Sequence, residues 1–339
     1  MANATGERRA DIDALRGLAV LLMVMVHLAA TATPSSASRT SWLAYVVAGL
    51  GGLAAPLFVV LAGWAAASRP RPPSSRMRRA GLLLACQVVV NLSAPHLYGP
   101  LTPGVLSLFA LLALLPTAST SPAVQRATHW TFVAASLVLI IALPAWQGPS
   151  SWSARVETAG FTDVLQHLLV SGLYPLFPWV LLALLGHRLR AHGPSTLPLR
   201  LLLLAGLLSS AAALVLSLQS GRAWAAPTSP EGEAFLVFFP ANGAFLLAAC
   251  SGVLILWRSA PLLSNVPGMA ALGQVSLSVY VLHTPVLFVL HRMEPAGGWA
   301  AGWSAVFVVA GTLIWWPVAA LWVKHARERS LEGLMRRWS

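Results

Sequence analysis

The sequence predicts an all-α, polytopic membrane protein with about ten transmembrane helices and both termini in the cytoplasm. Of its 339 residues, 57% are hydrophobic and only 9% are charged, and the mean hydropathy is +0.72. A soluble globular domain carries about 25% charged residues, so this composition excludes that class. The apolar residues also gather into runs of roughly the 20 residues that a helix needs to cross a bilayer.

Five apolar runs lie in the first half of the chain. Proline, glycine or charged residues bound each of them and mark the turns and membrane interfaces. Asp13 and Arg16 mark the start of the first run, and Arg79 and Pro95 flank the third. In order, the runs are 15–32, 43–67, 80–94, 101–117 and 129–146.

Five further runs follow, with boundaries of the same kind. Arg190 closes the sixth run, Gly221 follows the seventh, and Arg258 closes the eighth. Gly268 precedes the ninth run, and Lys324 closes the tenth. In order, these runs are 172–189, 198–218, 235–257, 270–291 and 300–323.

The connections between the runs are short. The longest lie near 68–79, 147–171 and 219–234, and each is too short for a soluble domain. We therefore expect residues 1–339 to form one integral-membrane domain. The Pro- and Arg-rich connection at 68–79 should stay out of helix and face anionic lipid headgroups or an anionic ligand.

The basic residues predict the orientation. With a cytoplasmic N-terminus, eighteen of the 22 Lys and Arg residues fall on the inner side, as the positive-inside rule expects. The net charge of +12 therefore reflects topology, and the dispersed basic residues give no support for nucleic-acid binding. The outer side keeps four: Arg39, Arg155, Arg222 and Arg292.

Two other interpretations of short segments are not favoured. Residues 17–30 have the apolar character of a signal peptide, but Asp11 and Asp13 precede them, so we expect a retained span. Cys86 and Cys250 each lie inside an apolar run, where a thiol behaves as a small hydrophobic group. We expect neither a disulfide nor a metal site.

A polar stripe follows the first expected helix. Arg16 and His27 are eleven residues apart, which places them on one face about 16 Å apart along the axis. Asp13, three residues before Arg16, joins that face. Polar groups at membrane depth are costly and are therefore functional candidates, although a lone histidine is often only a helix–helix hydrogen-bond partner.

A second stripe in the run 270–291 strengthens the functional interpretation. Gly273, Ser276, Tyr280 and His283 are spaced as one face of a helix. This run also leads from inside to outside, so His283 should reach a depth comparable to that of His27. Two histidines on two polar stripes predict a lined cavity.

The run RRADIDALRGLAVLLMVMVHL resembles the opening signature of the transmembrane acyltransferase superfamily. Its acyltransferase-3 members carry an Arg, ten residues and then an essential His on the first helix, as Arg16 and His27 do here. Further segments are similar to the heparan-α-glucosaminide N-acetyltransferase-like branch and its bacterial relatives: GGLAAPLFVVLAGWAAAS (51–68), SGLYPLFPWVLLALLGHRL (171–189) and LGQVSLSVYVLHTP (272–285).

One departure from that branch bears on the mechanism. The heparan N-acetyltransferase has an Asn near the position of His27 and its catalytic His in the following outer loop. Here that loop, residues 30–42, contains no His. The resemblance therefore argues against an amino-sugar acceptor of that kind and implies that His27 is catalytic, as in acyltransferase-3 proteins.

The resemblance implies an acyl-CoA donor, with acetyl as the expected acyl group, and no metal. Neutral imidazole suits a general base near neutral pH, and a histidine can also carry the acyl group covalently; both routes stay open for His27. We expect Arg16 and His283 to complete the catalytic set. Coenzyme A is polyanionic, and arginine suits its phosphates; the expected donor contacts are Asp13, Arg16, His187, Arg188, Arg190 and Tyr280.

The alternative function is a proton-coupled transporter that relays protons through its membrane-embedded histidines. All ten Asp and Glu residues fall in loops or at helix ends, which disfavours this alternative.

The expected partners are membrane lipids and a glycan or small-molecule acceptor, outside or lipid-linked, and a homodimer stays open. One Lys among 21 Arg residues suggests a GC-rich bacterium, and hence the bacterial inner membrane. Residues 161–171 should form an amphipathic helix on the outer surface, with Asp163 and His167 on its polar side.

Overall fold

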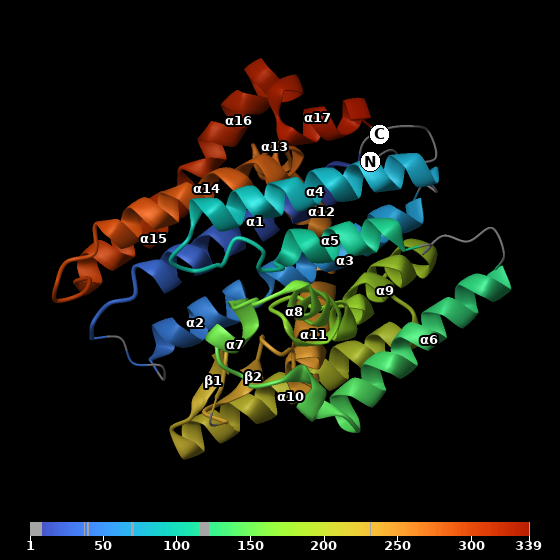
Figure 1. Cartoon of the computed structure of the whole chain (residues 1–339), viewed down its shortest axis with the longest axis horizontal. Helices are drawn as coiled ribbons and strands as arrows, with labels where there is room; N and C mark the ends of the chain where they lie inside the picture. The colour runs from blue at the N-terminus through green and yellow to red at the C-terminus, as the bar shows by residue number, and fades with distance from the viewer. Residues whose placement is uncertain are drawn as a thin grey trace. The chain divides into compact units, whose positions relative to one another are not determined.

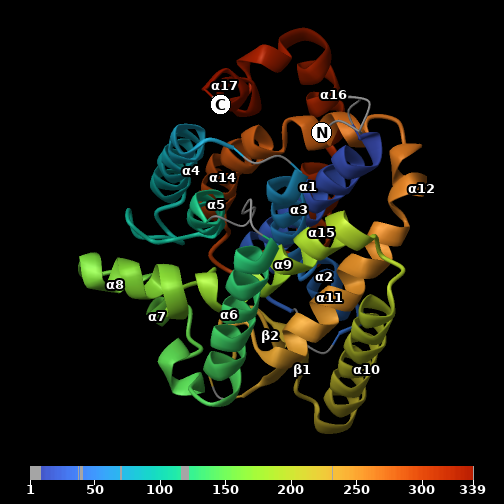
Figure 2. The same cartoon turned by 90° about the vertical axis from the view of Figure 1, so that its right-hand side faces the viewer.

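The computed structural model describes residues 9–36, 38, 41–68, 71–115, 122–230 and 232–338. These residues are mostly helical, as the composition predicts (Figures 1 and 2). The chain divides into two compact units. Unit 1 comprises Met1–Phe58 and Ile255–Arg337, and unit 2 comprises Val59–Leu254 with Trp338–Ser339. The expectation of a single domain stays a prediction.

Unit 1 combines the two ends of the chain, and α1 passes through its centre. Most residues in the first two-thirds of α1 are buried, which suits a helix that is largely apolar. The elements of unit 1 are α1 (Ala10–Thr31), α2 (Trp42–Gly51), the start of α3 (Ala54–Ser68), the end of α11 (Gly243–Arg258), α12 (Ala260–Ser264), α13 (Met269–Gln274), α14 (Ser276–Arg292), α15 (Ala301–Leu313), α16 (Trp315–Ala326), the 3-10 turn η3 (Arg327–Arg329) and α17 (Leu331–Trp338).

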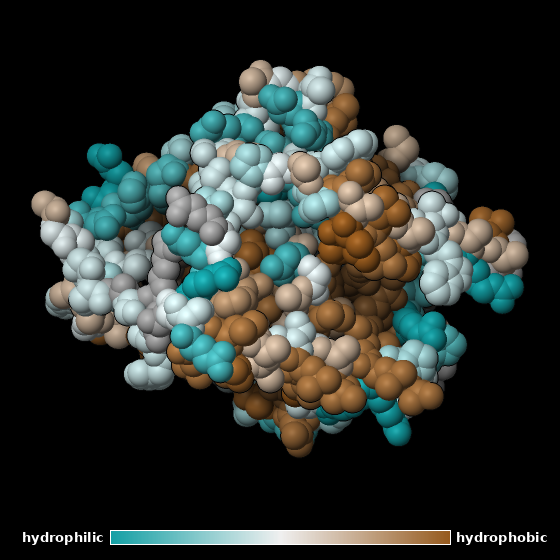
Figure 3. All heavy atoms as spheres, turned by 90° about the horizontal axis from the view of Figure 1, so that it is seen from below, coloured by the Kyte–Doolittle hydropathy of each residue, from teal (hydrophilic) through white to brown (hydrophobic). Residues whose placement is uncertain are grey.

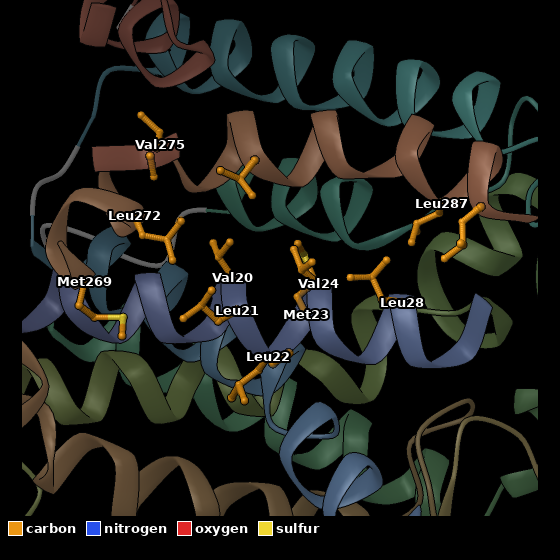
Figure 4. Packing of buried hydrophobic residues seen from close by; sticks show 14 of the residues in the cluster. Val20, Leu21, Leu22, Met23, Val24, Leu28, Met269, Leu272, Val275 and Leu287 are labelled. Carbon is orange, nitrogen blue, oxygen red and sulfur yellow. The ribbon is translucent and has the colours of Figure 1, made fainter. Parts of the chain in front are cut away.

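The hydrophobic core of unit 1 joins α1 to α13 and α14. Figure 4 shows Val20, Val24 and Leu28 of α1 directed toward the segment that carries Leu272 and Leu287. All five side chains are at least nine-tenths buried. Close van der Waals packing of such side chains is what holds membrane helices together, so this core packs α14 against α1.

Two glycines allow α1 and α13 to approach closely. A Cβ atom at Gly17 would overlap the carbonyl oxygen of Met269, and one at Gly273 would overlap the carbonyl oxygen of Asp13. The two positions therefore face each other's helix across the same crossing. Small residues at helix crossings are typical of membrane proteins, where close packing drives association.

The expected continuous helix at 270–291 is wrong, because the chain breaks at Val275. Val275 has φ −122° and ψ 26°, which ends α13 and starts α14. Gly273 therefore lies on a different helix from Ser276 and His283. The run 43–67 is likewise interrupted, between α2 and α3.

Unit 2 contains the central part of the chain. Its elements are the rest of α3, α4 (Pro73–Ser93), α5 (Val105–Leu114), α6 (Pro122–Ile141), the 3-10 turn η1 (Pro144–Gln147), α7 (Ser153–Val156), α8 (Phe161–Gln166), the π-helical turn η2 (His167–Ser171), α9 (Leu176–His192), α10 (Leu197–Ser220), the strands β1 (Ala223–Ala226) and β2 (Ala234–Val237), and most of α11. The two strands pair in parallel, with Ala223 opposite Ala234.

Two expectations for unit 2 are corrected. The connection 68–79 is not wholly outside helix, because α4 begins at Pro73. Proline is tolerated in the first turn of a helix, where its missing N–H has no intrahelical partner to lose. The run 235–257 is not one helix either, since its first residues form β2 before α11 begins at Gly243.

Among the described residues, five helical stretches are long and apolar enough to cross a membrane. A sixth results if α8 with η2 and α9, which are bent by 46°, form one span. Large apolar side chains are exposed along α10, for example Leu204 and Leu208. Figure 3 shows broad apolar areas on the one face of the molecule that it depicts. The chain is therefore an integral membrane protein by these features, while the count of ten spans and the side of the termini stay predictions.

Candidate functional site

The two predicted catalytic histidines are in direct contact inside unit 1. Nδ1 of His27, on α1, lies 2.8 Å from Nε2 of His283, on α14. The ring planes differ by 9° and their centroids are 5.1 Å apart. With the nitrogens so close and the rings so nearly parallel, the hydrogen bond runs edge to edge, where the lone pair of an imidazole nitrogen points.

A backbone carbonyl determines which nitrogen carries each proton. Nδ1 of His283 lies 2.5 Å from the carbonyl oxygen of Tyr280, which can only accept. His283 therefore donates from Nδ1, and in its neutral form Nε2 has a lone pair. His27 must then donate from its own Nδ1 to that lone pair. The remaining nitrogen, Nε2 of His27, is left as the basic atom of the pair.

The two rings differ in exposure. His283 is only 1% exposed, whereas His27 is half-buried. The enclosed histidine is thus suited to hold its neighbour, and the more accessible one is suited to meet a substrate.

Pro285 lies inside α14, close to His283. Proline has no N–H to give to the carbonyl four residues earlier, which is that of Val281. The hydroxyl of Thr284 donates to the Val281 carbonyl at 2.8 Å instead. The irregular turn thus keeps its carbonyls satisfied around His283.

Arg16 is held in place by Asp13. Nη1 of Arg16 lies 3.0 Å from Oδ1 of Asp13, one turn earlier on α1. Asp13 is 1% exposed and Arg16 is 21% exposed, so the carboxylate is inside and the guanidinium reaches outward. The predicted stripe of Asp13, Arg16 and His27 is therefore present on α1, with its first two members joined as an ion pair.

Tyr280 contributes in a way that the sequence did not indicate. Its backbone carbonyl is the atom that binds His283, while the donor contact expected of Tyr280 stays a prediction. Its ring is also beside His283, with centroids 5.6 Å apart. Every residue type has a backbone carbonyl, so the identity of Tyr280 could not predict this contact. Only its spacing from His283 in the sequence pointed to this position.

The other predicted donor contacts lie in unit 2, at the end of α9. His187 is 2.7 Å from the amide nitrogen of Gln125 and packs edge-on against His129. The guanidinium of Arg190 lies 5.1 Å from the ring centre of Trp64, a cation–π contact. Arg188 is exposed. These contacts suit an anchored helix end as well as a phosphate site, so the donor role of the group stays a prediction.

The expected amphipathic helix at 161–171 is corrected. The α-helix ends at Gln166, and His167 is buried, with its two nitrogens 2.9 Å from the Ser171 hydroxyl and the Glu157 carbonyl. Asp163 accepts from the amide of Ala159 at 2.8 Å. Both side chains therefore hold the segment together, and His167 does not face the outer surface.

Arg155 in the same region, expected from the sequence only as an outer charge, is a buried cation. It is fully buried and donates to the carbonyls of Ser171, at 2.6 Å, and Gly148, at 2.9 Å. Burial lowers the pKa of Arg155 to about 10, so it stays protonated at neutral pH. It therefore ties together the connection between α6 and α9.

Within the described part of the chain, no group of three or more His, Cys, Asp or Glu side chains is placed to hold a metal ion. The candidate site of unit 1 consists of the His27–His283 pair and the Asp13–Arg16 pair.

Comparison with known protein families gives one match over most of the chain. Residues 9–322 match the family described as the acyltransferase domain of the acyltransferase-3 type. No curated protein and no solved structure matched the chain.

Proposed function

Because the chain belongs to the acyltransferase-3 family and is therefore a membrane acyltransferase, we propose that it moves an acyl group, with acetyl expected, from cytoplasmic acyl-CoA to an extracytoplasmic or lipid-linked acceptor. The acceptor group is a hydroxyl or an amine, such as that of a sugar. His27 is the residue that performs the transfer.

The contact between His27 and His283 is the observation that carries this proposal. The Tyr280 carbonyl fixes the proton on His283, and His283 in turn fixes the proton on His27. Nε2 of His27 is then unprotonated before the reaction. This is the arrangement by which an orienting group prepares a histidine as a general base.

In the direct route, Nε2 of His27 takes the proton of the acceptor as its oxygen or nitrogen attacks the thioester carbonyl. The tetrahedral intermediate then collapses with cleavage of the carbon–sulfur bond. His27 returns its proton to the departing sulfur, so that the products are the acylated acceptor and free CoA thiol. The imidazolium formed meanwhile still donates from Nδ1 to His283.

In the covalent route, Nε2 of His27 itself attacks the thioester carbonyl, and CoA leaves as the thiolate. The acyl group then resides on His27 until the acceptor displaces it, and the proton that the acceptor loses ends on the CoA thiolate, so that the products are again the acylated acceptor and free CoA thiol. Both routes need the same nitrogen of His27, with the same support from His283.

Donor binding is assigned to the other end of the stripe. Arg16 lies about 16 Å from His27 along α1, a distance that the long pantetheine arm of CoA can cover. The ion pair with Asp13 orients the Arg16 guanidinium, whose planar array of donors suits a phosphate. His187, Arg188, Arg190 and Tyr280 complete the proposed set of donor contacts.

A proton-coupled transporter is the less favoured alternative. A proton relay through the membrane needs groups that continue on both sides of the histidines. His283 instead donates its other proton to a backbone carbonyl, which cannot pass a proton on. The contacts of the pair therefore fit a general base, His27, with an orienting partner, His283, better than they fit part of a proton relay.

Turnover of radiolabelled acetyl-CoA by the purified protein tests the proposal. In detergent, with octyl β-D-glucosaminide as an acceptor that offers both hydroxyls and an amine, we expect release of CoA thiol and label in an acylated product or in acetate formed with water as acceptor. Absence of CoA release, in a preparation that remains folded and monodisperse, would contradict the proposed donor.

A further inference from the structure

The C-terminal helix of unit 1 makes a specific polar contact with the helix that carries His283. Oε1 of Glu332, on α17, accepts from the backbone N–H groups of Leu277, at 2.5 Å, and Ser278, at 3.3 Å. Its other oxygen, Oε2, accepts from the Ser278 hydroxyl at 2.8 Å. One carboxylate therefore binds three donors in the first turn of α14.

The contact is reciprocal. The Ser278 hydroxyl, which donates to Glu332, also accepts from the backbone N–H of Leu331 at 2.9 Å. Ser278 is 1% exposed, so these hydrogen bonds form away from water. Each helix thus supplies a partner for the first turn of the other.

The first turn of α14 needs such a partner. Its first N–H groups have no acceptor within the helix, and the residue at the N-cap position, Val275, has no polar side chain to supply one. A carboxylate also interacts favourably with the positive end of the helix dipole. Glu332 therefore does from a distant segment what an Asp or Ser at the cap does in most helices.

α17 is itself fixed so that Glu332 points to this place. The hydroxyl of Ser330, which is 2% exposed, accepts from the backbone N–H of Gly333 at 3.0 Å and caps the start of α17. A Cβ atom at Gly333 would overlap the carbonyl oxygen of Glu328, so the turn from η3 into α17 is tightly packed. Glu332 is thus held by two short-range features of its own segment.

His283 lies five residues after Ser278, or about 7.5 Å along α14. The break at Val275 separates α14 from the crossing of α1 and α13, so that crossing does not by itself fix where α14 begins. We propose that Glu332 is a positioning residue for acyl transfer, which sets the register of α14 and so keeps His283 in contact with His27. This role rests on the proposed function of His27.

The test combines activity with two readouts that need no activity. The purified, full-length protein is compared with Glu332→Ala, Glu332→Gln and the control Glu328→Ala. The control removes a carboxylate from the same segment, and the Glu328 side chain is 72% exposed. The readouts are the kcat and KM for acetyl-CoA, hydrogen exchange at the amides of Leu277 and Ser278, and the rate at which diethyl pyrocarbonate modifies His27.

We expect Glu332→Ala to speed exchange at both amides, to alter the modification rate of His27, and to lower kcat by about tenfold to a hundredfold, the cost of a displacement of about 1 Å. The KM for acetyl-CoA should stay near the wild-type value. Glu332→Gln keeps one acceptor oxygen and should lie between Ala and wild type, while Glu328→Ala should match wild type. Should Glu332→Ala fail to fold, Ser278→Ala must show smaller changes of the same kind.

Faster exchange in Glu332→Ala with an unchanged modification rate and unchanged kcat would overturn the positioning role, and unchanged exchange would overturn the cap itself. Equal loss of activity in the Ala and Gln variants, with a raised KM, would indicate general damage and also contradict the proposal. If the wild-type protein releases no CoA, the proposed function fails, whereas the exchange and modification data still decide whether Glu332 positions the histidine pair.

Discussion

Nδ1 of His27 lies 2.8 Å from Nε2 of His283, although 256 positions separate the two residues in the chain. The pair exists because the core of unit 1 holds α14 against α1 and because the Tyr280 carbonyl fixes the proton of His283. The chemistry proposed for the protein follows from this contact, and so do most of its testable consequences.

Replacement of His283 should separate its role as an acceptor from its role in packing. His283→Phe keeps a ring but offers no acceptor to His27, so kcat should fall by up to about 10⁴-fold, as when a catalytic histidine loses its orienting partner. His283→Gln can place its amide oxygen near the lost Nε2 and should retain more activity. Steady-state CoA release measures both variants, and equal activity of Phe and Gln would argue that His283 only fills space.

Replacement of Arg16 should weaken donor binding more than it slows the saturated enzyme, because its proposed role is recognition of anionic phosphates. Arg16→Gln alone removes the positive charge that lies 3.0 Å from the buried carboxylate of Asp13, and the loss of a charge partner inside a protein is destabilising. The informative variant is therefore Asp13→Asn combined with Arg16→Gln. We expect a raised KM for acetyl-CoA, and an unchanged KM with a reduced kcat would place Arg16 in the chemistry or in packing.

The close crossing of α1 and α13 should be sensitive to a single methyl group. Gly17→Ala and Gly273→Ala each force a Cβ atom into a backbone carbonyl and should lower the free energy of unfolding by about 1–3 kcal/mol. Gly81→Ala, in α4, is the matched control, because nothing lies within 4 Å of its Cβ position. Thermal unfolding in one detergent compares the three, and equal melting temperatures would show that the crossing tolerates expansion.

The distance along α1 predicts the sidedness of the reaction. His27 is about 16 Å beyond Arg16, in a hydrocarbon core about 30 Å thick, so it should lie at or beyond the midplane. In sealed proteoliposomes of known orientation, acyl-CoA on the N-terminal side should support transfer to a membrane-impermeant sugar confined to the opposite side. If donor and acceptor are needed on the same side, the transfer does not cross the membrane.

Local patterns predicted much of the site. The eleven-residue step from Arg16 to His27 places both on one face of any regular helix, and α1 is regular throughout. The spacing of Tyr280 and His283 likewise predicted a second polar face. The direct contact of His27 with His283 could not be predicted, because it depends on how two helices that are far apart in the sequence pack against each other.

The breaks in the expected helices show where local patterns were insufficient. Val275 carries no proline or glycine signal, and its non-helical backbone follows directly on the tight packing of Gly273 against Asp13. The apolar segment Ala234–Val237 suits a strand as well as a helix, and only its pairing with β1 decides between them. The position of His167 in the sequence predicted an exposed side chain on the polar face of a helix. Its two ring nitrogens instead make hydrogen bonds inside the protein.

Whether Nε2 of His27 performs the transfer is decided by the variant His27→Ala. Alanine is well tolerated in a membrane helix, so the variant should insert, purify as a monodisperse species and unfold near the wild-type temperature. CoA release from radiolabelled acetyl-CoA, measured for wild type and variant at saturating donor, should fall to the level of a protein-free control. Turnover by folded His27→Ala near the wild-type rate would show that His27 does not perform the transfer, because neither the direct nor the covalent route can proceed without this nitrogen.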